Sequence, residues 1–247
     1  MRFSALACDY DGTVSADGMI ADDTVEALSR IVQSGRKLLL VTGRELPDLL
    51  HVCPKINLFH WVVAENGGLL YQPTTGREEP LAPPPSAEFV ATLTRREVEP
   101  CTTGRVIVST RQPHEKVVLE TIRDLGLELQ VIFNKGAVMV LPSGTNKATG
   151  LASALEKLQV PLTSTVAVGD AENDHALLES CAVGVAVANA VPLLKAHADW
   201  VTDVPNGEGV RQLIDRLLAN DLADLQPKLR QKPPAPGAIC LRPLSPQ

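Results

Sequence analysis

The sequence predicts an α/β fold, in which a doubly wound parallel sheet carries a smaller inserted α+β unit. Short continuous apolar runs alternate with amphipathic segments in both halves of the chain, which is typical of buried parallel strands connected by helices. The middle of the chain changes to a helix–strand–helix–strand–strand order after a proline-rich joint over 77–89. This change of pattern predicts the insert.

The first part of the sheet is expected to contain three strands and two helices. In chain order they are a strand over 3–9, a helix over 22–35, a strand over 37–43, a helix over 45–53 and a strand over 60–68. Asp22 or Asp23 can cap the first helix, and Gly35 ends it. The apolar stripe of that helix consists of Val25, Leu28 and Val32.

The insert is expected over 81–142, between core segments 1–80 and 143–222. Its elements are a helix over 86–99, a strand over 105–110, a helix over 113–126 and two strands over 127–133 and 137–142, joined by a turn at Asn134–Gly136. The core then resumes with helices over 147–160, 173–180 and 207–220 and strands over 164–170, 182–189 and 200–203. Residues 223–247 have the composition of a proline-rich tail or linker, which predicts a possible further domain in the same polypeptide.

Composition argues against several classes of protein. The chain has 247 residues, 45% of them hydrophobic, and a net charge of −6, and it has no basic run interleaved with aromatics, so nucleic acid is not an expected partner. No apolar stretch approaches the roughly 20 residues that span a membrane, and Asp9 interrupts any signal-peptide core, so a cytoplasmic protein is expected. The five scattered cysteines include no CxxC pair and indicate neither a zinc site nor a disulfide framework.

Polar residues follow the predicted strands at their carboxyl ends, where ligands bind in such sheets. Asp9 and Asp11, two residues apart, are expected on one strand face, where a cation and Lys147 would relieve their repulsion. The other residues expected at this edge are Thr42, Gly43, Arg44, Asp170, Asn173 and Asp174. Three carboxylates with oxygen-only ligation suit Mg²⁺, whereas Thr42, Lys147 and the backbone near Gly12 and Gly43 suit a phosphate.

Four segments in order, DYDGT, VTGR, TNKATGL and VGDAEND, resemble the motifs of the haloacid dehalogenase (HAD) superfamily of aspartate-nucleophile phosphatases. The AENGG stretch and the position of the insert resemble the type IIB cap subgroup, which includes sugar-phosphate and phosphoglycolate phosphatases. The resemblance covers about residues 1–220 and implies a Rossmann-like core with a cap.

The resemblance also implies a role for each matching residue. Asp9 would attack phosphorus, and Asp11 would protonate the leaving oxygen and then activate water. The phosphate would be bound by Thr42, Gly43, Lys147 and Asn173, and Mg²⁺ by Asp9, Asp11, Asp170 and Asp174. Arg44 can reach the substrate or form a surface salt bridge, and Asn66 can lie near the substrate or serve a structural turn. Four residues of the insert remain open candidates for substrate contact: Arg105, Arg111, His114 and Lys135.

The function predicted from these residues is a Mg²⁺-dependent phosphatase that hydrolyses a small phosphorylated metabolite through an aspartyl-phosphate. The resemblance implies a substrate of the sugar phosphate or phosphoglycolate type, and an insert that is short for the subgroup implies a small one. One alternative is a phosphomutase or phosphotransferase of the same superfamily. Another is a phospho-accepting regulatory module within a larger protein.

Overall fold

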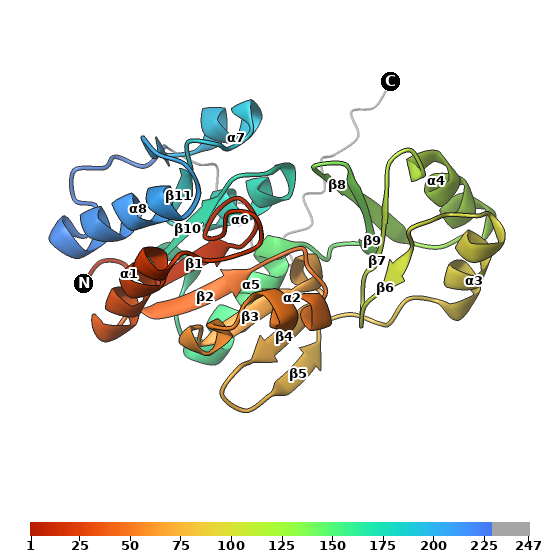
Figure 1. Cartoon of the computed structure of the whole chain (residues 1–247), viewed down its shortest axis with the longest axis horizontal. Helices are drawn as coiled ribbons and strands as arrows, with labels where there is room; N and C mark the ends of the chain where they lie inside the picture. The colour runs from red at the N-terminus through yellow and green to blue at the C-terminus, as the bar shows by residue number, and fades with distance from the viewer. Residues whose placement is uncertain (229–247) are drawn as a thin grey trace, which may run out of the picture.

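A computed structural model describes residues 1–228, which form two sheets that lie beside one another (Figure 1). The larger sheet has eight strands in the order β12-β11-β10-β1-β2-β3-β4-β5. They are β1 (Ala5–Asp9), β2 (Lys37–Val41), β3 (Trp61–Ala64), β4 (Leu69–Gln72), β5 (Arg77–Pro80), β10 (Thr165–Gly169), β11 (Val183–Ala186) and β12 (Trp200–Val201). Pairing is parallel from β12 to β3 and antiparallel from β3 to β5.

Helices cover both faces of this sheet. Side chains of one face of β1, such as Leu6 and Cys8, pack with α1 (Asp22–Gln33), α2 (Leu46–Val52) and α8 (Asn206–Asn220). The alternate side chains Ala5 and Ala7 pack with α5 (Lys147–Leu158), α6 (His175–Ser180) and α7 (Pro192–His197). Because successive side chains of a strand point to opposite faces, a strand buried on both sides must be apolar throughout. The predicted doubly wound α/β class is confirmed.

The smaller sheet is antiparallel and has the order β6-β7-β9-β8. Its strands are β6 (Thr102–Thr103), β7 (Val108–Arg111), β8 (Leu129–Asn134) and β9 (Ala137–Pro142). Side chains of α3 (Ala87–Arg95) and α4 (Glu115–Asp124) pack on one face of this sheet and form a core of their own. We call this unit, α3 to β9, the cap.

Several local predictions are wrong. Arg77–Pro80, expected within a proline-rich joint, forms strand β5. Its charged sequence does not predict a strand, and its strand conformation comes from pairing with β4. Neither Asp22 nor Asp23 caps α1, whose N-cap is Ala21; both lie in the first turn, where negative charge favours the helix. The buried stripe of α1 is Ala27, Leu28 and Ile31, because the helix is rotated so that Val25 and Val32 are only partly covered.

Two further predictions concern membrane spans and the C-terminal tail. No helix within residues 1–228 is both long and apolar enough to cross a bilayer. Most of the predicted tail, residues 229–247, lies outside the described residues.

Candidate active site

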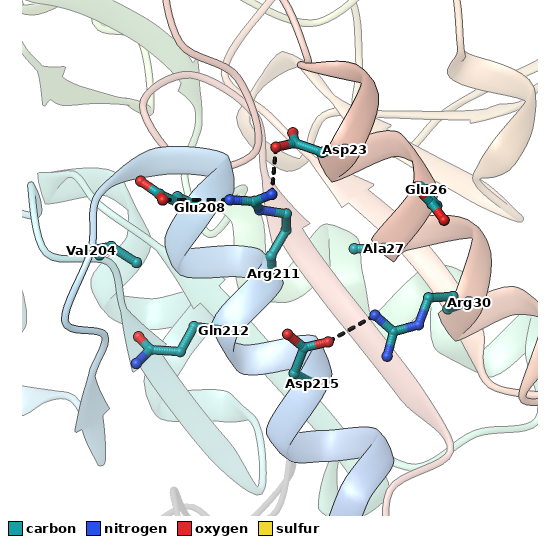
Figure 2. A pocket seen from close by; sticks show the side chains of 9 residues that line it. All are labelled: Asp23, Glu26, Ala27, Arg30, Val204, Glu208, Arg211, Gln212 and Asp215. Atoms are coloured by element: carbon teal, nitrogen blue, oxygen red, sulfur yellow. Dashed lines mark hydrogen bonds and ion pairs between the residues drawn. The ribbon is translucent and has the colours of Figure 1, made fainter.

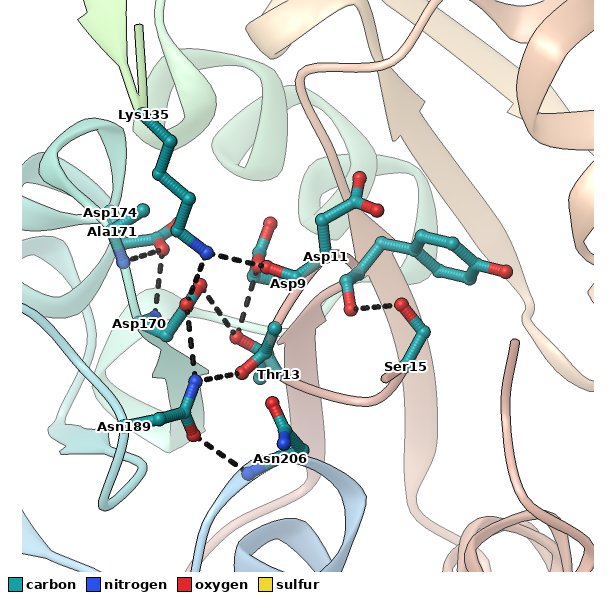
Figure 3. A network of polar contacts seen from close by, with 12 residues as sticks. Asp9, Asp11, Thr13, Ser15, Lys135, Asp170, Ala171, Asp174, Asn189 and Asn206 are labelled. Atoms are coloured by element: carbon teal, nitrogen blue, oxygen red, sulfur yellow. Dashed lines mark hydrogen bonds and ion pairs between the residues drawn. The ribbon is translucent and has the colours of Figure 1, made fainter. Parts of the chain in front are cut away.

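The central strands of the large sheet bring three aspartates together (Figure 3). Asp9 is the last residue of β1, Asp170 follows β10, and Asp174 ends the short 3-10 helix η4 (Glu172–Asp174). Their carboxylate oxygens lie within 4.8 Å of one another, and all three side chains are buried. This edge is where the sequence predicted that polar residues would converge.

Lys147 supplies the buried positive charge of this cluster. It is the first residue of α5 and 1% exposed, and its Nζ donates to Asp9 Oδ1 at 2.6 Å and to Asp174 Oδ1 at 2.7 Å. Burial and the neighbouring Asp174 raise the pKa of Asp9 to about 8, although Lys147 acts in the opposite direction. Burial also raises the pKa of Asp170. One ammonium therefore does not balance three carboxylates, and the site has excess negative charge.

Asp174 holds the loop after β10 in place. Its Oδ2 accepts hydrogen bonds from the backbone N–H groups of Asp170 and Ala171, each at 2.9 Å, and its Oδ1 accepts from Lys147. Both oxygens thus already have protein donors. The geometry favours a supporting role for Asp174, which fixes the orientation of Asp170.

The turn after β1 fits closely against Asp170. Gly12 has φ +81°, and a Cβ at this position would lie only 2.4 Å from Asp170 Oδ2, so both backbone and space require glycine. The Thr13 hydroxyl is 3.0 Å from Asp9 Oδ2 and 3.3 Å from Asp170 Oδ1. Asn189 donates through Nδ2 to the Gly12 carbonyl at 2.8 Å. The sequence placed Thr13 at this strand end without indicating a role for it. Nothing in the sequence pointed to Asn189, which follows β11 without any distinguishing local pattern.

Asp11 lies beyond the end of β1 and is balanced by a different cation. Arg44 donates to both of its carboxylate oxygens at 2.7 Å and also to Asp48 Oδ2 at 2.5 Å. The expectation that Asp9 and Asp11 share a strand face, with Lys147 relieving both, is wrong because the strand ends at Asp9. Of the two alternatives for Arg44, the structure shows the salt bridge.

A second polar group surrounds Gly43. Thr42 is buried at the end of β2, and its hydroxyl oxygen accepts from the Arg44 N–H at 3.1 Å. Asn173 Nδ2 donates to Asn66 Oδ1 at 2.9 Å. Within the described part of the chain, Asn66 Nδ2 and Asn173 Oδ1 are buried without partners. A Cβ on Gly43 would lie 3.5 Å from Asn173 Nδ2 and 3.9 Å from Asn66 Oδ1, so both amides lie beside Gly43.

The cap contributes Lys135, which the sequence left open. This residue is at the β8–β9 turn, and its Nζ donates to Asp170 Oδ2 at 2.6 Å and to the Asp11 carbonyl at 3.4 Å (Figure 3). The Lys135 ammonium thus lies at a position where a cation can contact both the Asp170 carboxylate and the Asp11 carbonyl. Three carboxylates here face the two ammonium groups of Lys147 and Lys135, and this oxygen-rich donor set fits a divalent cation.

Replacing Lys135 with glutamine is expected to tighten Mg²⁺ binding about 3- to 10-fold, because the ammonium and the metal compete for Asp170. Isothermal titration calorimetry of the phosphate-free protein measures this directly. Lys116→Gln, a cap variant on α4, is the control and should bind Mg²⁺ as the wild type does. Unchanged or weaker affinity in Lys135→Gln would contradict the competition.

Glu65 connects the large sheet to the cap. Its side chain is fully buried, and its carboxylate accepts from the backbone N–H groups of Arg105, Val106 and Ile107 at 2.9, 2.7 and 3.1 Å. A Cβ on Gly104 would lie 2.6 Å from the same carboxylate. Glu65 therefore fixes the segment that enters β7. The sequence indicated only that residues 65 and 66 end a strand.

Glu65→Gln is expected to lower the free energy of unfolding by about 1–3 kcal/mol, because an amide group replaces one acceptor oxygen in front of buried N–H donors. Urea denaturation measures the loss. Glu78→Gln removes only the partly exposed pair with Arg105 and should cost less than about 1 kcal/mol. Equal losses in the two variants would show that the buried anchor has no special role.

A cavity of about 280 Å³ opens between the large sheet and the cap. Its walls come from both parts: Asp9, Asp11, Gly43, Arg44, Asp48, Ser109, Arg111, Asn134, Ala137 and Met139. A cavity of about 500 Å³ lies between α1 and α8 (Figure 2), but its charges pair with one another, as in Arg30–Asp215 at 2.7 Å and Arg211–Asp23. The cavity beside Asp9 is thus the candidate for substrate.

A parallel sheet with helices on both faces, an inserted cap and a buried aspartate cluster define a class of hydrolase, which comparison with known proteins identifies. The family model of haloacid dehalogenase-like hydrolases matches residues 6–105 and 98–214. The chain belongs to this family and is a phosphatase.

Individual relatives agree with this assignment. A phosphoglycolate phosphatase of Methanothermobacter thermautotrophicus is 31% identical over 223 residues, which cover 87% of this chain and 98% of the relative. A haloacid dehalogenase-like hydrolase from Bacteroides thetaiotaomicron shares the fold with a TM-score of 0.75 and 21% identity, over 87% of this chain and 99% of that one. A subclass IIB sugar phosphatase of the superfamily gives a TM-score of 0.72 and 21% identity, over 87% and 98%.

Proposed function

We propose that this phosphatase is Mg²⁺-dependent and hydrolyses a small phosphorylated metabolite, of the sugar phosphate or phosphoglycolate type, through an aspartyl-phosphate on Asp9. The observation that carries the proposal is the position of Asp9, a buried carboxylate held by Lys147 that also lines the cavity between core and cap. The name of the Methanothermobacter relative supports a small phosphorylated acid as one substrate type. Residues 81–142 would act as the cap over a core of 1–80 and 143–222.

Asp9, Asp170 and the Asp11 carbonyl would hold Mg²⁺, with Asp174 supporting Asp170 through the loop backbone. When bound, the metal supplies positive charge that neutralises both the aspartates and a phosphoryl oxygen. The oxygens of Asp9 and Asp170 stay oriented by Thr13, whose hydroxyl lies between them.

In the first step, an Asp9 oxygen attacks phosphorus, the bond to the ester oxygen breaks, and Asp11 gives that oxygen a proton. In the second step, water attacks the aspartyl-phosphate, its proton passes to Asp11, and phosphate leaves Asp9 free. Asp11 is the candidate for both proton transfers because it lines the same cavity as Asp9.

The phosphoryl oxygens would be bound on the core side. Lys147 uses two of its three hydrogens on Asp9 and Asp174, which leaves one for the substrate. The Thr42 oxygen accepts from a backbone N–H, so its own hydrogen can be donated. Of the two amides beside Gly43, Asn66 has the free donor and Asn173 the free acceptor. Asn66 is therefore a better phosphate donor than Asn173, which would position it.

The test is phosphate release from a panel of phosphorylated metabolites with Mg²⁺ and with EDTA, combined with mass spectrometry of the rapidly quenched enzyme. We expect turnover only with Mg²⁺ and a phosphate-sized mass increase on the peptide that contains Asp9. Absence of turnover on every ester, with Mg²⁺ bound, would overturn the proposal. Stable phosphorylation of Asp9 without turnover would indicate a phospho-accepting module instead.

A further inference from the structure

The cap wall of the cavity beside Asp9 has one charged side chain without a partner. Arg111, at the end of β7, is exposed and lines the cavity, and its guanidinium makes no hydrogen bond or ion pair with any residue in 1–228. The other arginine in the cavity, Arg44, is fully engaged by Asp11 and Asp48. Each of the three carboxylates that line the cavity thus has another cation as its partner, Arg44 for Asp11 and Asp48 and Lys147 for Asp9.

The β-sheet register places Arg111 on the face that looks toward the core. Arg111 lies opposite Ala137, and Ser109 lies opposite Met139, so all four share one face of the β7–β9 pair and all four line the cavity. The intervening Thr110 is buried toward the other face. The orientation of Arg111 thus follows from strand pairing rather than from chance placement of a long side chain.

Reaction geometry decides which part of a substrate meets this wall. Phosphoryl transfer places the attacking and leaving oxygens roughly in line with phosphorus. Asp9 attacks from the core wall, so the leaving group points away from Asp9 and toward the cap. Arg111 therefore meets the alcohol part of the ester, not the phosphate itself.

An uncompensated guanidinium selects the chemistry of that alcohol. Its planar donors match a carboxylate with two parallel hydrogen bonds, whereas a neutral sugar would leave the charge unbalanced when the cavity closes. The volume of about 280 Å³ lies near the lower limit for ligand pockets and suits a short molecule.

We propose that Arg111 is a substrate-binding residue that recognises a carboxylate on the leaving group, so that the enzyme prefers phosphate esters of short hydroxy acids over sugar phosphates. This proposal rests on the proposed phosphatase function and makes its substrate class specific. It assigns the specificity to one side chain of the cap.

The test compares phosphoglycolate with hydroxyethyl phosphate, an ester of similar size without the carboxylate. We expect the wild type to favour phosphoglycolate in kcat/KM by about 10- to 100-fold, the range expected for a charged, bidentate contact. Arg111→Met should lose most of that preference yet keep hydroxyethyl phosphate turnover within about 3-fold, and Arg111→Lys should retain part of it. Arg123→Met, which removes an exposed arginine of α4, is the matched control and should leave the preference unchanged.

A binding experiment separates this proposal from the proposed function. Phosphonopropionate and propylphosphonate are not hydrolysed, so calorimetry with the Mg²⁺-loaded protein reports carboxylate recognition even where no ester is turned over. Tighter binding of phosphonopropionate that disappears in Arg111→Met would support the carboxylate site. Equal binding of the two phosphonates, or an equal loss of turnover for both esters in Arg111→Met, would overturn it.

Discussion

Replacing Asp9 with asparagine is expected to abolish phosphatase turnover, lowering kcat by roughly 10⁴- to 10⁶-fold, while the protein stays folded. The amide keeps the shape of the side chain but cannot form the acyl-phosphate, so both chemical steps are lost. Lys147 is not left alone in the interior, since Asp174 still accepts its hydrogen bond at 2.7 Å. The measurement is phosphate release under saturating Mg²⁺, with circular dichroism as the check on folding.

Asp48→Asn is the matched control, because Asp48 lines the same cavity but is half exposed and contacts only Arg44 among the described residues. It should retain turnover within about 10-fold, because Arg44 keeps its two hydrogen bonds to Asp11. Comparable losses in the two variants would mean that Asp9 is not the nucleophile.

Asp9→Asn should also change how the stability of the metal-free protein depends on pH. The pKa of Asp9 is about 8 when folded and near 4 when unfolded, so between these values the folded state holds a proton that the unfolded chain releases. Stability of the wild type without metal therefore falls as pH rises from about 4 to 8. Asp9→Asn should make this decline shallower, which urea denaturation in EDTA at several pH values can measure.

Replacing Lys147 with methionine is expected to have the largest combined effect on stability and activity. The variant retains the length of the side chain but leaves Asp9, Asp170 and Asp174 without their buried cation. Removal of one partner from a buried ion pair costs about 3–5 kcal/mol, and loss of a phosphate-binding charge should lower kcat/KM by at least about 10²-fold. Urea denaturation in EDTA and steady-state kinetics with Mg²⁺ measure the two losses.

Lys157→Met provides the control within the same helix. Lys157 forms a partly exposed pair with Glu79 at 2.7 Å, so its removal should cost no more than about 1 kcal/mol and should not affect turnover. The stability gap between the two variants should narrow as the pH falls below about 8, because a protonated Asp9 no longer needs the ammonium. A Lys147 variant as stable as the control at pH 8 would contradict the charge balance derived from the structure.

Features that depend on local patterns could be predicted from the sequence. Continuous apolar runs such as 38–41 are typical of strands buried on both faces, which is why the doubly wound class could be predicted. The polar residues at strand ends had to converge because parallel strands share one carboxyl edge, and Asp9, Asp170 and Lys147 do lie in contact or close together there.

Features that depend on partners distant in the sequence became visible only in the folded protein. Strand β5 has a charged sequence and becomes a strand only by pairing with β4. The pairing of Asp11 with Arg44 depends on where β1 ends, and a shift of one residue would change the face on which a side chain lies. Lys135 and Arg111 belong to the cap, and only its docking onto the core brings Lys135 to Asp170 and Arg111 into the cavity beside Asp9. A sequence pattern indicates which side of a helix or strand is buried. The contacts between core and cap, which are proposed to select the substrate, form only when both parts are folded.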